Sequence, residues 1–177
     1  DVSVTGVLKS DTIELQQDNT DLIIASGGLV NDYNGDGECA FDHIDKTGSI
    51  DIYGTLKCVN VKIDIKDGED VTVLSGGLIK ADSIDVVNQN DLTIASGATI
   101  TDYDDNGACV ITLQDTSDMY VTGSLTCGAS ASVTITNGAF DVTSAGTVVT
   151  PVLTVTATGI LTVAGSVTSS TSAALTT

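Results

Sequence analysis

Residues 91–100 read DLTIASGATI, and this phrase decides the fold. Its first half alternates apolar and polar residues, a small polar pair and a glycine follow, and the alternation then resumes. Such a pattern is typical of a β-strand, a tight bend and a second strand. Related phrases return at residues 21–27, 50–56 and 71–79, and again near residues 121, 142 and 161.

The bends recur at a nearly constant interval. Their glycines stand at positions 6, 27, 54, 76, 97, 123, 146 and 165. A period at the short end of the range of about 20–50 residues is the sequence signature of a solenoid or a similar repeat protein. We therefore expect eight copies of one unit, each with two strands and two turns.

A larger repeat contains the small one. Residues 32–39 (DYNGDGEC) match residues 102–109 (DYDDNGAC), and residues 55–58 (TLKC) match residues 124–127 (SLTC). Three bends therefore form one superunit, and the superunits cover residues 1–69, 70–138 and, in part, 139–177. We expect one β-repeat domain over residues 1–177.

The expected fold is all-β, a β-solenoid of stacked β-arches with about eight coils. A single unit is too short to bury its own apolar face, whereas stacked copies pair edge to edge and enclose a core. A β-sandwich is the alternative, because strands about ten residues apart with turn signals also suit that class. No window shows the spacing of an amphipathic helix, so we expect almost no helix.

The charge excludes two classes of partner. The sequence has twenty-four acidic residues, six lysines and no arginine, which gives a net charge of −18. Nucleic acid and anionic membrane surfaces would be repelled. No apolar run approaches the roughly 20 residues that a membrane span needs, so we expect no membrane insertion.

The four cysteines predict two disulfides. The interval from Cys39 to Cys58 is close to one coil, and so is the interval from Cys109 to Cys127. Successive coils bring Cα atoms within the roughly 7 Å that a disulfide allows, whereas a Cys39–Cys109 pair would be three coils apart. We predict Cys39–Cys58 and Cys109–Cys127. Paired cysteines and a chain that begins at Asp1 rather than Met lead us to expect a processed, extracellular or cell-surface protein.

Two acidic insertions resemble the first half of a calcium-binding loop, D-x-[DN]-x-[DN]-G. The Glu expected at position 12 is replaced by His43 and Leu113, but an acid follows two places later in both copies. Asp and Gly are also ordinary turn residues, so a polar turn is the alternative. As cation ligands, with Ca²⁺ first, we predict Asp32, Asn34, Asp36 and Asp45 in one copy and Asp102, Asp104, Asn106 and Asp115 in the other.

Nothing in the sequence favours an enzyme. His43 is the single histidine, and no Gly-x-Ser-x-Gly elbow is present. Asp51, Asp64, Asp82 and Asp85 could pair as glycosidase carboxylates do, but alternation already explains them as the solvated side of strands. A chain without arginine is also poorly equipped to hold an acidic polysaccharide.

The phrase VTVLSGGL at residues 71–78 resembles the passenger-domain repeats of autotransporter-type adhesins and other right-handed β-helices. The tandem β-arches, paired cysteines and acidity are also similar to those of the amyloid-like sheath proteins of methanogenic archaea. Both resemblances imply a solenoid that works at a cell surface.

The ends of a solenoid suggest the function. Its first and last coils expose unpaired backbone groups, and neither end of this sequence offers a capping helix. We therefore expect a structural protein that self-assembles edge to edge into a cell-surface filament, sheath or layer, with further copies of itself as its partner. The alternative is a monomeric, rod-like adhesin or binding module, for which cell-surface glycans would be the partner.

Overall fold

The computed structural model describes residues 1–16, 19–43, 48–65, 70–87, 89–104, 107, 109–128, 130–136, 138–156 and 160–176. Within these residues the chain forms twenty-four short strands and no helix. The strands make three parallel sheets of eight strands each, named here sheets A, B and C. Each sheet takes every third strand, so three consecutive strands form one coil. The predicted β-solenoid is confirmed, and the β-sandwich is not the fold.

Each sheet is continuous from the first coil to the eighth. Sheet A contains, in spatial order, β1 (Val2–Val4), β4 (Leu22–Ile24), β7 (Ile50–Ile52), β10 (Val71–Val73), β13 (Leu92–Ile94), β16 (Met119–Val121), β19 (Ala139–Val142) and β22 (Ile160–Val163). Sheet B contains β2 (Val7–Lys9), β5 (Leu29–Asn31), β8 (Thr55–Lys57), β11 (Leu78–Lys80), β14 (Thr99–Thr101), β17 (Ser124–Thr126), β20 (Thr147–Val149) and β23 (Ser166–Thr168). Sheet C contains β3 (Thr12–Leu15), β6 (Glu38–His43), β9 (Asn60–Ile65), β12 (Ser83–Val86), β15 (Val110–Leu113), β18 (Ser132–Thr136), β21 (Val152–Thr156) and β24 (Ser172–Thr176).

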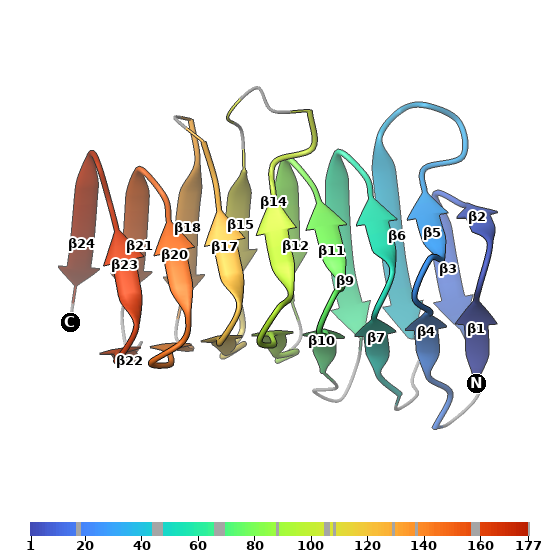
Figure 1. Ribbon diagram of the computed structural model, residues 1–177, viewed down its shortest axis with the longest axis horizontal. Helices are drawn as coiled ribbons and strands as arrows, with labels where there is room; N and C mark the ends of the chain where they lie inside the picture. Colours follow the sequence, from blue (N-terminus) through green and yellow to red (C-terminus); the bar gives the residue numbers. More distant parts are fainter. Residues whose placement is uncertain are drawn as a thin grey trace.

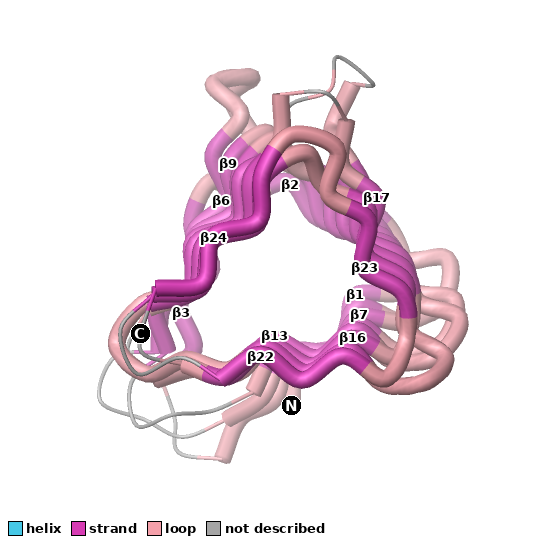
Figure 2. Tube along the Cα trace, turned by 90° about the vertical axis from the view of Figure 1, so that its left-hand side faces the viewer, coloured by secondary structure: helices cyan, strands magenta, loops and turns pink. Residues whose placement is uncertain are grey.

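The molecule is a straight prism. Its coils succeed one another along the long axis, and the two termini lie at opposite ends (Figure 1). Viewed along that axis, the three sheets form the sides of a triangle and the loops gather at its three corners (Figure 2). Coil 1 comprises β1–β3 and coil 8 comprises β22–β24.

The expected count of two strands per unit is wrong, because each coil has three. The phrase at residues 91–100 supplies only the strands of sheets A and B, β13 and β14. The third strand, on sheet C, is the separate alternating segment that follows, such as β12 or β18. Closing a triangle needs this third side, because the short strands of sheets A and B leave one flank of the core open.

The bend glycines all lie at the corner between sheets A and B. This corner is closed by two residues in coils 1, 3, 6 and 8, and by four residues in coils 2, 4, 5 and 7. In three of the four-residue turns a glycine adopts the left-handed conformation, with φ of +80° at Gly27, +86° at Gly76 and +80° at Gly97. Glycine adopts this conformation without steric penalty, which explains the S-G signal in the sequence.

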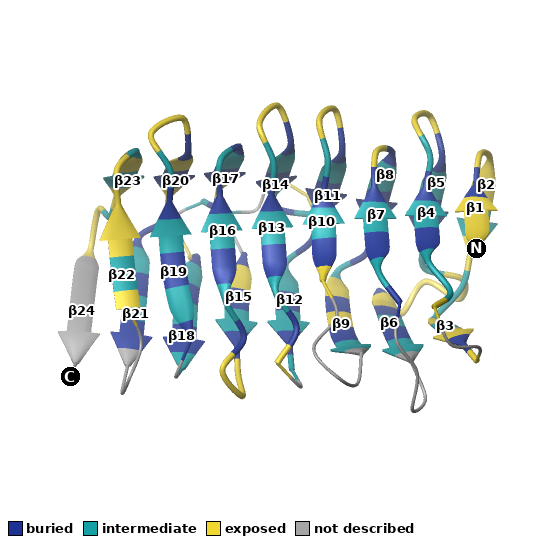
Figure 3. Cartoon of the chain, turned by 90° about the horizontal axis from the view of Figure 1, so that it is seen from below, coloured by how far each residue is buried: buried dark blue, intermediate teal, exposed yellow. Residues whose placement is uncertain are grey.

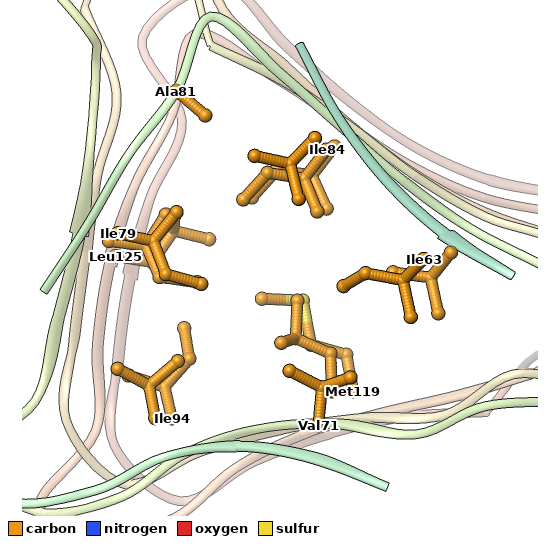
Figure 4. Packing of buried hydrophobic residues seen from close by; sticks show 14 of the residues in the cluster. Ile63, Val71, Ile79, Ala81, Ile84, Ile94, Met119 and Leu125 are labelled. Atoms are coloured by element: carbon orange, nitrogen blue, oxygen red, sulfur yellow. The ribbon is translucent and has the colours of Figure 1, made fainter. Parts of the chain in front are cut away.

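The core consists of apolar residues stacked at equivalent positions of successive coils. Side chains that alternate inward along each strand meet in the middle of the triangle, as Ile63, Ile79, Ile84 and Ile94 show (Figure 4). The parallel register places residues at equivalent positions of successive coils beside one another. One such row in sheet A consists of Ile52, Val73, Ile94 and Val121. Val, Ile and Leu fill most of this narrow interior, with Phe41 and Phe140 among them, which fits the low aromatic content of 3%.

Candidate functional site

Two long loops stand out from the corner between sheets B and C. One connects β5 to β6 in coil 2, and the other connects β14 to β15 in coil 5. They project from the same edge of the prism (Figure 2). These are the two acidic insertions of the sequence, and they lie three coils apart, as the superunit repeat predicts.

The first loop is folded by its own carboxylates. Asp32 Oδ1 accepts the backbone N–H groups of Asn34 at 2.9 Å and Gly35 at 2.8 Å. The Asn34 amide nitrogen donates to Asp36 Oδ2 at 2.8 Å and to Asp11 Oδ2 at 3.0 Å. Asp11 lies in coil 1, so the loop bends back toward the preceding coil and is tied to it.

The second loop repeats this arrangement. Asp102 accepts the N–H groups of Asp104 at 2.9 Å and Gly107 at 2.6 Å. The Tyr103 N–H donates to Asp82 Oδ1 at 3.1 Å, as the Tyr33 N–H donates to Asp11 Oδ1 at 2.9 Å in the first loop. The second loop therefore also bends toward the preceding coil.

Each loop brings three carboxylates together. The groups are Asp11, Asp32 and Asp36 in one place and Asp82, Asp102 and Asp104 in the other, with one oxygen of each residue within 4.8 Å of the other two. Sequence reasoning found two members of each group and missed Asp11 and Asp82. A signal was present, because in both copies an aspartate precedes the first loop aspartate by about one coil, Asp11 before Asp32 and Asp82 before Asp102.

The other predicted ligands differ in where they lie. Asn34 lies among the first three carboxylates, where its amide donates to two of them. Asp45 and Asn106 lie outside the described residues. Asp115 lies beyond the far end of β15, at the corner between sheets C and A, and is not part of the second group. A strand of sheet C therefore separates it from the loop that it was expected to close.

Three carboxylates at this separation form an oxygen-rich site of high negative charge. Hard cations such as Ca²⁺ are bound by oxygen ligands of this kind. Hydrogen bonds from the Glu38 backbone N–H and the Asn34 amide lower the pKa of Asp36, so this carboxyl stays ionised. Among the described residues, the chemistry of the loops is thus that of an anionic oxygen site.

Both predicted disulfides are confirmed, and each joins two successive coils next to a loop. Cys39 in β6 is bonded to Cys58, with Cα atoms 5.9 Å apart, and Cys109 to Cys127, with Cα atoms 5.4 Å apart. All four cysteines are buried. Each bridge anchors the end of an acidic loop to the coil that follows it.

A ladder of aspartates occupies the corner between sheets C and A. Asp21, Asp70, Asp91 and Asp118 each stand immediately before a strand of sheet A. Asp91 Oδ1 accepts the Asp118 N–H at 2.9 Å, and Asp21 Oδ1 accepts the Ser49 N–H at 3.0 Å, so these carboxylates connect successive coils.

The ladder shifts several pKa values. Burial raises the pKa of Asp91, and the neighbouring Asp118 and Asp70 charges add to the rise. Burial and the Asp21 charge likewise raise the pKa of Asp51. The hydrogen bond from the Tyr120 hydroxyl to Asp118 Oδ2 raises the pKa of Tyr120 to about 12. The coils are thus held together here by groups whose charges repel one another.

A shallow hollow of about 260 Å³ lies on sheet C where β6, β9 and β12 run side by side. Its polar lining includes Glu38, Asn60, Lys62, Ser83 and Asp85. Lys62 forms an ion pair with Asp64 at 2.7 Å, which raises the pKa of Lys62. The hollow is therefore a polar surface of mixed charge.

At the two ends of the prism, apolar side chains are exposed at positions that are buried in the middle coils. Within the described residues, β1 pairs only with β4 and β22 only with β19. Inward-facing Val2 is 43% exposed and Val163 45%, whereas Leu22 and Val142, their partners in the row, are 0% exposed. Figure 3 shows the exposed end strands β1 and β22 on either side of the buried central strands.

Comparisons with protein-family models, with curated proteins and with solved structures found no match to this chain. In the part of the chain that the structure describes, no helix is long and apolar enough to cross a membrane.

Proposed function

We propose that this chain is an extracellular structural protein whose copies assemble edge to edge into a cell-surface filament, sheath or layer. The observation that carries the proposal is the exposure of the end coils. Among the described strands, the outermost strand of each parallel sheet has an unpaired edge at both ends of the prism. Apolar residues at positions that the middle coils bury are exposed at those two places. A further coil would satisfy both the backbone and the side chains.

Two further features support an extracellular structural role. The two disulfides favour an oxidising compartment and stabilise the coils that they join against unfolding. The net charge of −18 keeps prisms apart sideways, so association is directed to the ends. The proposal gives the chain no catalytic role.

Size-exclusion chromatography and negative-stain microscopy of the purified chain test the proposal. We expect elongated assemblies whose width is that of the prism and whose length grows with concentration. A particle that stays at the 17.9 kDa mass of one chain at all concentrations would remove the proposal.

Calcium binding by the loops stays a prediction. The two three-carboxylate groups support it, Asp115 lies away from them, and Asp45 and Asn106 stay predicted ligands outside the described residues. Bound Ca²⁺ would offset the repulsion within each group and fix the loop to the preceding coil.

A monomeric, rod-like adhesin is the second candidate. The projecting loops and the polar hollow on sheet C favour it, because both present side chains to a partner. Tyr33 at the first loop is 70% exposed, as expected for a contact residue of a binding surface. Under this alternative the chain stays monomeric, so the same chromatography separates the two functions.

A further inference from the structure

The first acidic loop contains an Asn-Gly pair, Asn34–Gly35, and both of its residues are exposed to solvent. In such a pair the backbone nitrogen of the glycine can attack the side-chain carbonyl carbon of the asparagine, because glycine has no side chain to hinder the approach. A Cβ built on Gly35 would meet nothing within 4 Å, so no neighbouring residue blocks this position either. The pair is therefore a chemical candidate for the conversion of asparagine to aspartate.

The attacking nitrogen of this reaction has a carboxylate on its proton. The Gly35 N–H donates to Asp32 Oδ1 at 2.8 Å. A general base must lie within hydrogen-bond reach, about 2.6–3.2 Å, of the proton that it removes. A peptide nitrogen becomes acidic only as it bonds to the carbonyl carbon, so the base acts in the transition state. Asp32 lies where this step requires it.

The carbonyl group under attack is polarised by the same loop. Asn34 Oδ1 accepts the Asp36 N–H at 2.7 Å, which folds the asparagine side chain back along the Gly35 peptide. Negative charge develops on this oxygen when the nitrogen adds to the side-chain carbon, and a backbone N–H at this distance stabilises that charge. Both reacting groups are restrained before the reaction begins, which lowers its entropic cost.

The nitrogen that must leave is held on the opposite side of the amide. Asn34 Nδ2 donates to Asp36 Oδ2 at 2.8 Å and to Asp11 Oδ2 at 3.0 Å. These two bonds fix the amide so that its oxygen, and not its nitrogen, accepts the Asp36 N–H. Because Asn34 is exposed, solvent supplies the proton with which this nitrogen departs as ammonia.

From these contacts we infer that Asn34 is a self-modification site, at which the first loop promotes the conversion of its own asparagine to aspartate. A bond forms between Gly35 N and Asn34 Cγ, the Cγ–Nδ2 bond breaks, and the Gly35 proton passes to Asp32 and then to solvent. The cyclic succinimide then adds water and opens to aspartate or isoaspartate. Water is consumed, ammonia is released, and no oxidant is needed. The inference does not depend on the proposed self-assembly.

The second loop already carries the product residue at this position. The repeat of the two loops aligns Asp102 with Asp32 and Asp104 with Asn34. The Asp104 N–H donates to Asp102 Oδ1 at 2.9 Å. The Asn34 N–H makes the same bond to Asp32, also at 2.9 Å. An aspartate at position 34 is therefore compatible with the fold of the loop.

Conversion would change how the first loop is held to coil 1. The amide that now donates to Asp11 and Asp36 would be replaced by a carboxylate, which cannot donate to either of them. Two hydrogen bonds would be lost and a like charge would be added to the group. We therefore expect the converted loop to be released from the Asp11 side chain.

The rate of conversion in the folded and the unfolded chain tests the inference without any substitution. Freshly purified protein is incubated at one pH with and without guanidinium chloride, then digested and analysed by mass spectrometry. Peptide mapping assigns the change to residue 34, because the sequence has two further Asn-Gly pairs, at 106–107 and 137–138. We expect Asn34 to convert at least about 10-fold faster in the folded chain. Equal or slower conversion there would overturn the inference.

A matched pair of variants tests the role of the base. Asp32→Asn keeps an oxygen that can accept the Gly35 N–H but removes the base, so conversion should slow at least about 10-fold. Glu38→Gln removes a negative charge at the end of the same loop, and its side chain makes none of the contacts described above, so the rate should not change. Conversion of Asp32→Asn at the wild-type rate, or equal slowing in both variants, would contradict the proposal. If Asp32→Asn does not fold, the comparison of folded and unfolded wild type still decides.

Discussion

Coil 3, in the middle of the prism, and coil 1, at its end, share a two-residue turn but differ in what surrounds it. Gly54 faces carbonyl oxygens of the coil beneath, whereas Gly6 faces nothing within 4 Å. Ile50 of coil 3 is 2% exposed, whereas Val2, at the equivalent position of coil 1, is 43% exposed. Each coil in the middle packs against two neighbouring coils, whereas coil 1 and coil 8 each pack against one. Stability should therefore be greatest in the middle and incomplete at the ends.

The largest expected effect is that of Gly54→Ala. The new methyl group would lie 2.3 Å and 2.4 Å from the oxygens of Ala25 and Gly28, so the backbones of two coils must separate. We expect a loss of about 4 kcal/mol or more in the free energy of unfolding. Denaturant unfolding of Gly54→Ala and Gly6→Ala checks this contrast between the two glycines. An equal loss of unfolding free energy in both variants would contradict it.

Truncation of a core side chain should come next. Ile94→Ala in the middle of the prism should lower the free energy of unfolding by about 3 kcal/mol, because the site is fully buried between two coils. Val163→Ala, in the same row at the last coil, should lower it by less than about 1 kcal/mol in the single chain, because this side chain is 45% exposed. Thermal melts at a concentration below assembly would measure both. A Val163→Ala loss as large as that of Ile94→Ala would contradict the account.

Removal of one disulfide should lower the stability of the coils beside the acidic loop that it anchors. Replacing Cys39 and Cys58 by serine removes a link across a sequence separation of 19 and should lower the free energy of unfolding by about 3 kcal/mol. Hydrogen exchange should show faster opening in coils 2 and 3 and little change in coils 7 and 8. The matched pair, Cys109 and Cys127, should shift the opening to coils 5 and 6.

Calcium should stabilise only the coils that carry the acidic groups. At a concentration one hundred times its dissociation constant, one bound ion would add about 2.7 kcal/mol to the free energy of unfolding. Titration calorimetry of a chelator-treated sample is the measurement, with Asp82→Asn as the variant that removes a ligand and Asp85→Asn, outside the group, as the control. The absence of heat at millimolar Ca²⁺ would end this prediction.

The smallest expected effect is the response to pH at the aspartate ladder. The pKa values of Asp51 and Asp91 are raised in the folded chain, so their contribution to stability is complete below the unfolded pKa of about 3.9. It is lost as the pH rises through the folded pKa values, and solvent screening keeps it under about 1 kcal/mol. Asp36, with its lowered pKa, acts in the opposite direction.

Substitution of the ladder tests this sign. Asp91→Asn keeps an oxygen that can accept the Asp118 N–H and removes the charge. We expect the variant to be more stable than the wild type at pH 7 and equal to it near pH 3. A variant that loses stability at pH 7 would show that the Asp91 charge supports the coils.

Most of the fold could be predicted because glycine and alternation are local signals. The eight bend glycines and the spacing of Cys39 and Cys58 were sufficient for the coil number and for the disulfide. The third strand of each coil, such as β9 (Asn60–Ile65), was not expected as a separate side of the coil. Such short strands leave no signal for how many sides enclose the core.

The candidate sites were harder to predict because stacking brings together residues one coil apart. Asp11 and Asp82 meet loops that follow them by about one coil, and no local motif connects them. Asp115 was expected to complete the calcium loop that begins at Asp102, but β15 carries it to another corner.

Cross-linking between copies tests the proposed self-assembly most directly. If a second copy continues sheet A in parallel register, Ser3 of one copy would lie beside Thr162 of the next, and neighbouring parallel strands place their Cα atoms about 4.8 Å apart, within disulfide range. A chain carrying both Ser3→Cys and Thr162→Cys should oxidise into a ladder of covalent multimers on a non-reducing gel. A chain with Ser3→Cys and Thr168→Cys, on different sheets, should not. Assembled samples that give only monomers or dimers with the first pair would contradict the account.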